Sequence, residues 1–230
     1  MKTIGLVGGT GWISTAEYYR IINEETNWRL GALEFARLAL YSVNFGDIQR
    51  FNEQRNTEGI FSMMLGAAKK LESIGADCIL LCANTMHMHA DRVEQEISIP
   101  LIHIARATAS QIRKKNMKTV GLLGTRPTME RDFYTKKLAE ENIAALVPEK
   151  DERVFIQRTI DEELLKGVFL VESKKRFLDI IRTLQSQGAE GVVLGCTEIP
   201  LLIKQEDIDV PLFDTTVIHS LAAVDFALGG

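Results

Sequence analysis

Short apolar runs alternate along this chain with longer segments in which apolar residues recur every three or four positions. The runs are bounded by glycine or polar residues, as is typical of buried strands in parallel sheets. They cover Thr3–Val7, Arg37–Val43, Cys78–Cys82, Leu101–Ile104, Thr119–Leu123, Ile143–Val147, Gly191–Leu194 and Pro211–Asp214. The longer segments have the helical period, as Ile60, Met64 and Leu71 show in the first half and Phe177 and Leu184 in the second. Strands that alternate with helices predict an α/β fold with helices on both faces of parallel sheets.

Three segments of the first half return, in the same order, in the second half. The offset changes little, from 116 to 113 to 111 positions, and a period of this length is too long for a solenoid. The matched pairs are Lys2–Thr10 with Lys118–Arg126, Gly75–Thr85 with Gly188–Glu198, and Ile99–His103 with Val210–Asp214. We therefore predict two copies of one α/β half.

Each copy is expected to be a three-layer α/β/α half with a four-stranded parallel sheet, and the two halves to be pseudo-symmetric. The first half is expected to comprise residues 1–104 with 216–230, and the second residues 105–215. Ligand sites in such sheets lie beyond the carboxyl ends of the strands. We therefore expect an active-site cleft between the halves.

Composition narrows the possible functions. The 230 residues are 46% hydrophobic and 25% charged, with a formal net charge of −4, the balance of an ordinary globular protein. The 27 basic residues are scattered, which argues against a nucleic-acid partner, because phosphate contacts need a concentrated positive face. No apolar run approaches the roughly 18 residues of a membrane span, and glycines interrupt the start too early for a signal peptide. Three cysteines do not make a disulfide framework, so we expect a cytoplasmic protein.

Glycine-containing loops follow the first predicted strand of each half. They are Gly8-Gly9-Thr10-Gly11 and Gly124-Thr125-Arg126-Pro127-Thr128. Glycine lets the backbone approach a ligand, and the start of the next helix offers free N–H groups to an anion. Neither loop contains Gly-x-Gly-x-x-Gly, so a dinucleotide site is not expected. The matched loops favour binding over the alternative of a tight turn without a ligand.

Cys196 follows the predicted strand Gly191–Leu194 and precedes a helix. The N–H groups of that helix are expected to lower the thiol pKa and so to supply a thiolate. Thr197 lies beside it, and Asn84 and Thr85 occupy the matching place in the first half, where small polar side chains suit a carboxylate. The alternative is that Cys196 is an inert packed residue.

The two segments that contain Asn84 and Cys196 resemble signatures of the aspartate/glutamate racemase family. Ile79–His87 resembles the first signature and Val192–Pro200 the second, and the Ile4–Gly9 loop and the duplicated layout match as well. The resemblance covers essentially the whole chain. It implies a cofactor-independent racemase of aspartate or glutamate, in which two cysteines, one from each half, act on opposite faces of the substrate α-carbon. It also implies a homodimer.

The resemblance assigns roles to particular residues. Cys196 becomes the acid/base residue, with Glu198 placed to orient or activate it. The residues that would hold the substrate's carboxylate and ammonium groups are Gly9, Thr10, Asn84, Thr85, Thr125, Thr128 and Thr197, with Ala83 beside them. Arg50, Asn52 and Lys166 are candidates for the side-chain carboxylate, the alternative being that each is a solvated surface residue. For Thr125 the alternative is simple capping of the next helix.

The first signature departs from the family's form at Ala83. The family has cysteine immediately before the asparagine, and the repeat independently pairs Cys196 with position 83. Cys82 lies one residue earlier, so the alternation of side chains along a strand predicts that it faces away from the site. The strand is ending there, however, and the family signature tolerates one inserted residue, so it stays open whether Cys82 reaches the substrate.

Three functions remain open from the sequence. The first is an aspartate or glutamate racemase. The second is a decarboxylase or isomerase of the same superfamily that uses a single thiol, which Ala83 supports, and the third is a non-catalytic protein that binds carboxylates. We expect no metal, because His87 and His89 are two positions apart and lie on different helix faces. His103 and His219 stand in no informative context.

Overall fold

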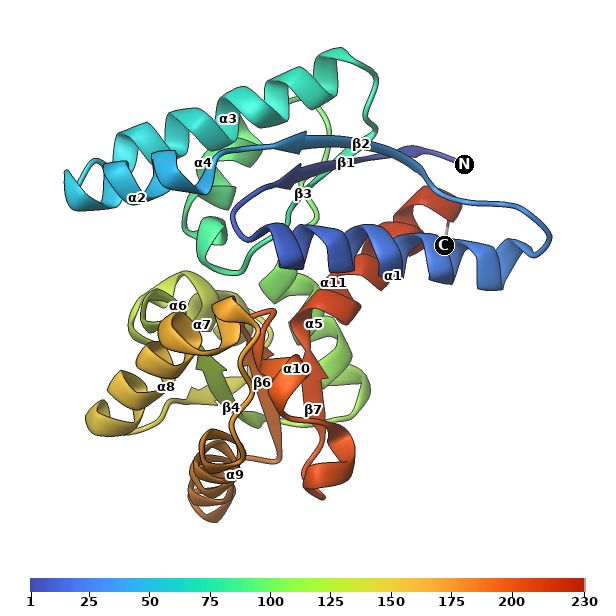
Figure 1. Ribbon diagram of the computed structural model, residues 1–230. Helices are drawn as coiled ribbons and strands as arrows, with labels where there is room; N and C mark the ends of the chain where they lie inside the picture. Colours follow the sequence, from blue (N-terminus) through green and yellow to red (C-terminus); the bar gives the residue numbers. More distant parts are fainter. Residues whose placement is uncertain (230) are drawn as a thin grey trace. The chain divides into compact units, whose positions relative to one another are not determined.

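The computed structural model describes residues 1–229 and confirms the predicted α/β class, with two parallel sheets (Figure 1). The strand orders are β2-β1-β3 in the first sheet and β5-β4-β6-β7 in the second. The strands are β1 (Thr3–Gly8), β2 (Arg37–Ser42), β3 (Cys78–Leu81), β4 (Thr119–Gly124), β5 (Ala144–Leu146), β6 (Gly191–Gly195) and β7 (Leu212–Asp214). These bounds lie within a few residues of the predicted runs.

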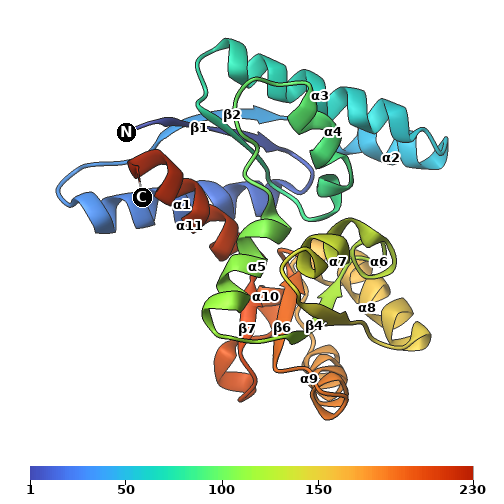
Figure 2. The same cartoon turned by 180° about the vertical axis from the view of Figure 1, so that it is seen from behind.

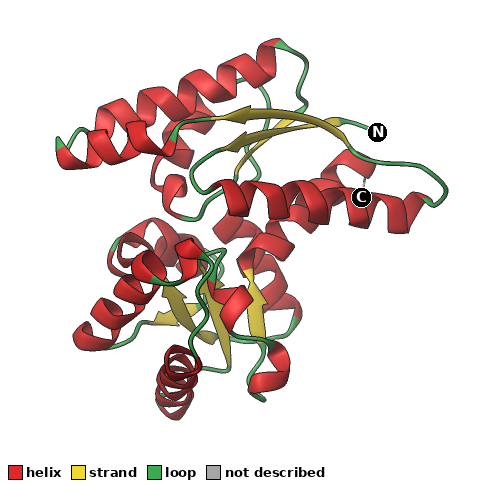
Figure 3. Ribbon diagram, in the orientation of Figure 1, coloured by secondary structure: helices red, strands yellow, loops and turns green. Residues whose placement is uncertain are grey.

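At least one helix lies between each pair of consecutive strands from β1 to β7, as Figure 3 shows by colour. In the first part of the chain they are α1 (Trp12–Leu30), α2 (Phe45–Glu53), α3 (Thr57–Ser73), η1 (Thr85–His89), α4 (Ala90–Gln95) and α5 (Ile104–Lys114). In the second part they are α6 (Arg126–Glu130), α7 (Asp132–Ala139), α8 (Lys150–Glu162), η2 (Leu164–Lys166), α9 (Val171–Ser186), α10 (Ile199–Leu202), η3 (Gln205–Asp207) and α11 (Thr215–Leu228). None of the helices in residues 1–229 combines the length and apolarity that crossing a bilayer requires.

The chain divides into two compact units, each built on one sheet. The first unit comprises Met1–His103 together with the C-terminal segment from His219, and the second comprises Ile104–Ile218. The repeat is visible in the strands: β4 begins 116 positions after β1, and β6 begins 113 positions after β3. In each sheet the first strand along the chain lies between the second and the third.

The first unit has three layers, because alternate residues of its strands enter different cores. Ile4 and Leu6 of β1 pack with α1 and with the C-terminal part of α11. Val7 faces the opposite side and packs with α2, α3 and α4. Figures 1 and 2 show these two helix groups on either side of the sheet.

The second unit repeats this arrangement. Val120 and Leu122 of β4 pack with α5 and α7, whereas Leu123 packs with α8 and α9 on the other face of the sheet. The expected three-layer organisation is therefore present in both units.

The four-stranded sheet predicted for each half forms only in the second unit. At the expected fourth strand of the first unit, Leu101 makes one isolated parallel bridge with Ile79, and Ile104 already begins α5. Of the two residues between them, Ile102 and His103, the second packs its ring against His87.

Candidate functional site

The loop after β1 has a backbone conformation that requires glycine. Gly9 has φ +86°, and a Cβ atom there would lie 2.0 Å from the carbonyl oxygen of Val43. Its N–H donates to Thr15 Oγ1 at 2.9 Å, which fixes the turn. The next residue, Thr10, has a buried hydroxyl that makes no hydrogen bond within residues 1–229. A buried hydroxyl without a partner is costly, so Thr10 is suited to bind a ligand.

The two candidate positions at the end of β3 face opposite sides of the first sheet. Ala83 packs on the α3 side, as Ile79 and Leu81 of the strand do. Cys82 packs with Cys78 and other core residues on the α1 and α11 side, where it is fully buried. Burial raises the pKa of the Cys82 thiol well above its usual range. Cys82 is therefore a core residue, and Ala83 takes the orientation that corresponds to Cys196 in the repeat.

Asn84 and Thr85 lie at the start of η1, where Asn84 is buried and Thr85 half-buried. This loop is held by His87, whose Nδ1–H donates to the carbonyl oxygen of Ala83 at 3.0 Å. Burial lowers the pKa of His87 to about 4, so the ring is neutral at physiological pH. His87 thus fixes the backbone at position 83, which the repeat pairs with Cys196.

Sequence reasoning missed the surroundings of His87. Its ring contacts those of His103 and His219, with centroid separations of 4.7 and 5.4 Å. His219 Nε2 lies 2.6 Å from the Ile102 carbonyl oxygen, and Tyr18 donates its hydroxyl to His219 Nδ1 at 2.8 Å. Burial, followed by the neighbouring His87, lowers the pKa of His219 to about 3. Residues so distant in sequence share no local pattern, so their spacing could not predict that they form a buried cluster of rings.

In the second unit, Cys196 and Glu198 form a hydrogen-bonded pair at the end of β6. Cys196 Sγ donates to Glu198 Oε2 at 3.0 Å, and the Thr197 hydroxyl donates to the same oxygen at 2.7 Å. Glu198 is buried, and Cys196 keeps 6% of its surface exposed while packing with residues of α8 and α9. A carboxylate that accepts from a thiol is placed to take its proton.

The expectation that the Cys196 thiol pKa is lowered was wrong. Burial raises this pKa well above its usual range, and the Glu198 carboxylate raises it further through its charge and hydrogen bond. The following helix, α10, is only four residues long, so it offers little of the dipole on which the expectation relied. Cys196 is therefore held as a protonated thiol whose hydrogen bond is accepted by Glu198.

The loop after β4 lies beside Gly195, the residue that precedes Cys196. The hydroxyl groups of Thr125 and Thr128 are 3.0 Å apart. Thr125 is the N-cap residue of α6 but makes no side-chain capping hydrogen bond, which disfavours the capping alternative. A Cβ atom at Gly195 would lie 3.1 Å from Thr128 Cγ2, so Thr128 packs against the residue before Cys196.

The candidates for a side-chain carboxylate are all exposed. Asn52 and Arg50 lie on α2, and Lys166 ends η2. Arg50 forms an ion pair with Asp47 on its own helix. Within residues 1–229, no group of three or more His, Cys, Asp or Glu side chains could hold a metal ion.

Comparison with known proteins places these features in one family. The family model described as Asp/Glu/Hydantoin racemase matches residues 7–223. The structure of a candidate Asp/Glu racemase from Yersinia pestis is 42% identical in sequence, with a TM-score of 0.94. The structure of an aspartate racemase homologue from Pyrococcus horikoshii is 38% identical, with a TM-score of 0.88. Each match covers 99% of this chain and all of the other chain. The broad specificity amino-acid racemase RacX of Bacillus subtilis is 24% identical over 96% of both chains.

Proposed function

We propose a function from the premise that this chain belongs to the Asp/Glu/hydantoin racemase family. The protein is an amino-acid racemase that acts on aspartate or glutamate by cysteine-mediated transfer of the α-proton, without pyridoxal phosphate. The observation that supports this most directly is the hydrogen bond between Cys196 and Glu198 in the loop that matches the family's second signature. The similarity to an aspartate racemase homologue favours a dicarboxylic amino acid as substrate.

The proposed mechanism follows the proton. Cys196 first passes its thiol proton to the Glu198 carboxylate, which leaves a thiolate. The thiolate removes the substrate α-proton, so that sulfur is protonated again and the electron pair of the C–H bond remains on the α-carbon. Buried donors around the substrate carboxylate would stabilise the developing charge.

The proposed substrate-binding residues are those that the resemblance assigned, and the structure adds an argument for two of them. Thr10 has a buried hydroxyl without a partner, and Thr128 packs beside the residue that precedes Cys196. The full set is Gly9, Thr10, Asn52, Ala83, Asn84, Thr85, Thr125, Thr128, Lys166 and Thr197.

Ala83 supports a second candidate function. This position has no sulfur, and Cys82 lies in the core of the first unit, so a mechanism with two thiols lacks its second acid. A single thiol removes and returns the proton on one face of the α-carbon. The second candidate is therefore a decarboxylase or isomerase that works with Cys196 alone.

Incubation of each enantiomer of aspartate and glutamate in heavy water separates these functions. Racemisation with deuterium at the α-carbon supports the racemase. Exchange with retained configuration supports the single-thiol enzyme, and binding without exchange indicates a carboxylate-binding protein. Cys196→Ser is expected to abolish exchange, because an alcohol is a far weaker base than a thiolate, whereas Cys78→Ala, which changes another buried thiol, should exchange normally. Undiminished exchange in Cys196→Ser would falsify the mechanism.

We also propose a homodimer. Large apolar side chains are exposed on α1 and the segment after it, with Trp28 80% and Leu33 87% accessible, and such surface is often covered by a partner. Light scattering of the purified chain tests this: a monomer at micromolar concentration contradicts it.

A further inference from the structure

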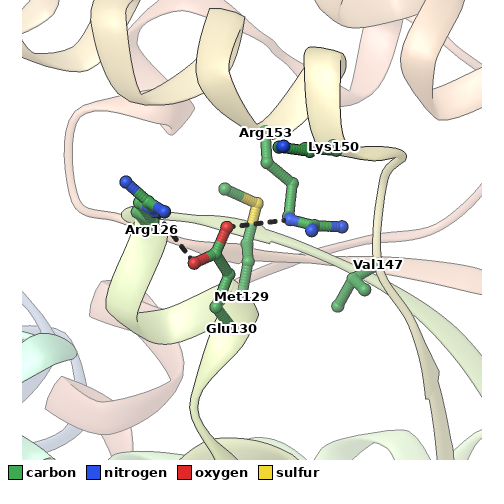
Figure 4. A pocket seen from close by; sticks show the side chains of 6 residues that line it. All are labelled: Arg126, Met129, Glu130, Val147, Lys150 and Arg153. Carbon is green, nitrogen blue, oxygen red and sulfur yellow. Dashed lines mark hydrogen bonds and ion pairs between the residues drawn. The ribbon is translucent and has the colours of Figure 1, made fainter.

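An open cavity on the second unit has no part in the proposed proton transfer. It has a volume of about 470 Å³, within the roughly 300–1,000 Å³ typical of small-molecule sites. Figure 4 shows its lining side chains, which come from α6, from the residue after β5 and from the first turn of α8. They are Arg126, Met129, Glu130, Val147, Lys150 and Arg153.

The cavity has an excess of positive charge. Glu130 accepts from Arg126 Nε at 2.8 Å and from Arg153 Nε at 3.2 Å (Figure 4). These two guanidinium groups hold the pKa of the Glu130 carboxyl below its usual range, so it remains an anion. Lys150 forms no ion pair within the part of the chain that the structure describes. Three cations thus line the cavity against one carboxylate.

Three acidic residues, Glu149, Asp151 and Glu152, lie within two positions of Lys150, but none of them lines the cavity. Glu149 and Glu152 make the reciprocal capping hydrogen bonds at the start of α8. Glu152 also lies 3.8 Å from Arg176, and neither glutamate lines the cavity.

The side chains define the chemistry of a ligand. Two planar guanidinium groups and an ammonium group can together bind an anion that has three oxygens and about two charges, whereas a carboxylate is matched by a single guanidinium. Met129 and Val147 add an apolar wall that a free phosphate ion would leave uncovered. We propose that this cavity binds a small organic phosphate monoester, with the phosphate on Arg126, Arg153 and Lys150 and the organic part on Met129 and Val147.

The cavity is connected to the loop that precedes α6. The backbone N–H of Arg126 donates to Gln157 Oε1 at 2.5 Å, and Gln157 Nε2 donates to both carboxylate oxygens of Asp161 at 2.9 Å. The charge of Asp161 is one of the influences that raise the Cys196 pKa. Hydrogen bonds through Gln157 would therefore connect a ligand on Arg126 to Asp161, whose charge acts on the Cys196 thiol.

Calorimetric titration of the full chain tests the proposal without any assay of catalysis. The probes are phenyl phosphate, inorganic phosphate and malate. We expect phenyl phosphate to bind at least about tenfold more tightly than the other two, and the affinity to fall as salt is added. Malate binding as tightly as phenyl phosphate would overturn the assignment to a phosphate, and no heat with phenyl phosphate at millimolar concentration would overturn the site.

Variants locate the binding. Lys150→Gln and Arg153→Gln are each expected to weaken phenyl phosphate binding about tenfold, because each removes a charge-assisted contact. Arg182→Gln is the matched control, since Arg182 is an exposed arginine of the same unit paired with Asp179 on α9. Equal affinity in Lys150→Gln, Arg153→Gln and Arg182→Gln would place the ligand elsewhere and contradict the proposal. Thermal unfolding of each variant shows whether it remains folded.

Discussion

A thiol that donates a hydrogen bond to a buried carboxylate is hard to ionise, because the product would be two adjacent anions. Cys196 and Glu198 are in this situation, with Sγ and Oε2 3.0 Å apart. Glu198 therefore raises the thiol pKa and also accepts the hydrogen bond of the thiol, which places it to take the thiol proton in the proposed mechanism. These two effects can be separated by substitution.

Glu198→Gln is expected to lower the Cys196 pKa, because the amide has no charge to oppose the thiolate. The pH dependence of alkylation by iodoacetamide should move to lower pH, while α-proton exchange falls by about 10²-fold or more through loss of the proton acceptor. Thr197→Val, which removes only the second hydrogen bond to Glu198, is the control and should shift the alkylation profile much less. An unchanged profile in Glu198→Gln would show that burial alone sets the pKa.

Position 83 allows a gain-of-function test. Ala83→Cys is expected to increase racemisation of both enantiomers, since it adds a thiol where the repeat places the partner of Cys196. Cys82→Ala should leave activity almost unchanged and cost about 1 kcal/mol of stability, because it removes one buried sulfur from an apolar core. Loss of activity in Cys82→Ala, in a protein that still unfolds cooperatively, would mean that the substrate reaches that core.

The sequence predicted orientation at these positions better than it predicted electrostatics. Strand alternation and the 113-residue offset together distinguish Cys82 from Ala83, because both depend only on backbone period. The Cys196 pKa depends instead on where the Glu198 side chain lies and on a helix that ends after four residues, and neither is visible in a pattern of residue types.

At the scale of elements, the backbone conformation at glycine determines the turn between a strand and the next helix. The turn after β1 depends on Gly9, where positive φ and the close approach of Val43 O coincide. Gly31, at the end of α1, also has positive φ (+77°), but a Cβ atom there would have nothing within 4 Å. A side chain at Gly31 would therefore introduce backbone strain alone, whereas a side chain at Gly9 would introduce both strain and steric overlap.

Gly31→Ala, which introduces backbone strain alone (φ +77°, ψ −171°), is expected to reduce the free energy of unfolding by about 1–3 kcal/mol, and Gly9→Ala, which adds steric overlap, by more than about 3 kcal/mol. Urea unfolding of both variants gives the comparison. Similar losses in the two variants would show that the turn after β1 can shift to admit a side chain.

Element positions were largely predictable because period and glycine placement are local. The repeat located β1, β3, β4 and β6 to within one or two residues. It failed at Leu101–Ile104, where the matching segment of the second unit forms β7 but this one makes a single bridge. In this segment the ring of His103 contacts the ring of His87, a contact that no local pattern encodes.

At the scale of the whole molecule, a cluster of buried rings connects distant parts of the chain within the first unit. Tyr18, His87, His103 and His219 come from α1, η1, the segment after the isolated bridge and α11. Within this set, the hydrogen bonds of His219 to Tyr18 and to the Ile102 carbonyl link α1, α11 and the segment before α5. Because the rings are buried, protonation of any one of them places an unsolvated charge in the core.

This arrangement predicts an acid-sensitive fold. Burial depresses the folded-state pKa of His87 to about 4 and that of His219 to about 3, while both are near 6.5 in the unfolded chain. At a pH between the folded and unfolded values, the unfolded chain binds more protons than the folded chain. The contribution of these two histidines to the free energy of unfolding is therefore fully present above pH 6.5 and is lost as the pH falls toward 4. Asp91 opposes this through its charge, which favours protonated His87.

The loss attributable to His87 is on the order of 3 kcal/mol across that range, and urea unfolding at pH 7.5, 6, 5 and 4 measures it. His87→Gln keeps an amide that can donate to the Ala83 carbonyl but cannot titrate. It should therefore show a shallower decline between pH 6.5 and 4, even where its stability at pH 7.5 is lower. An equally steep decline in the wild type and the variant would mean that carboxylates, and not the histidine cluster, cause the acid sensitivity.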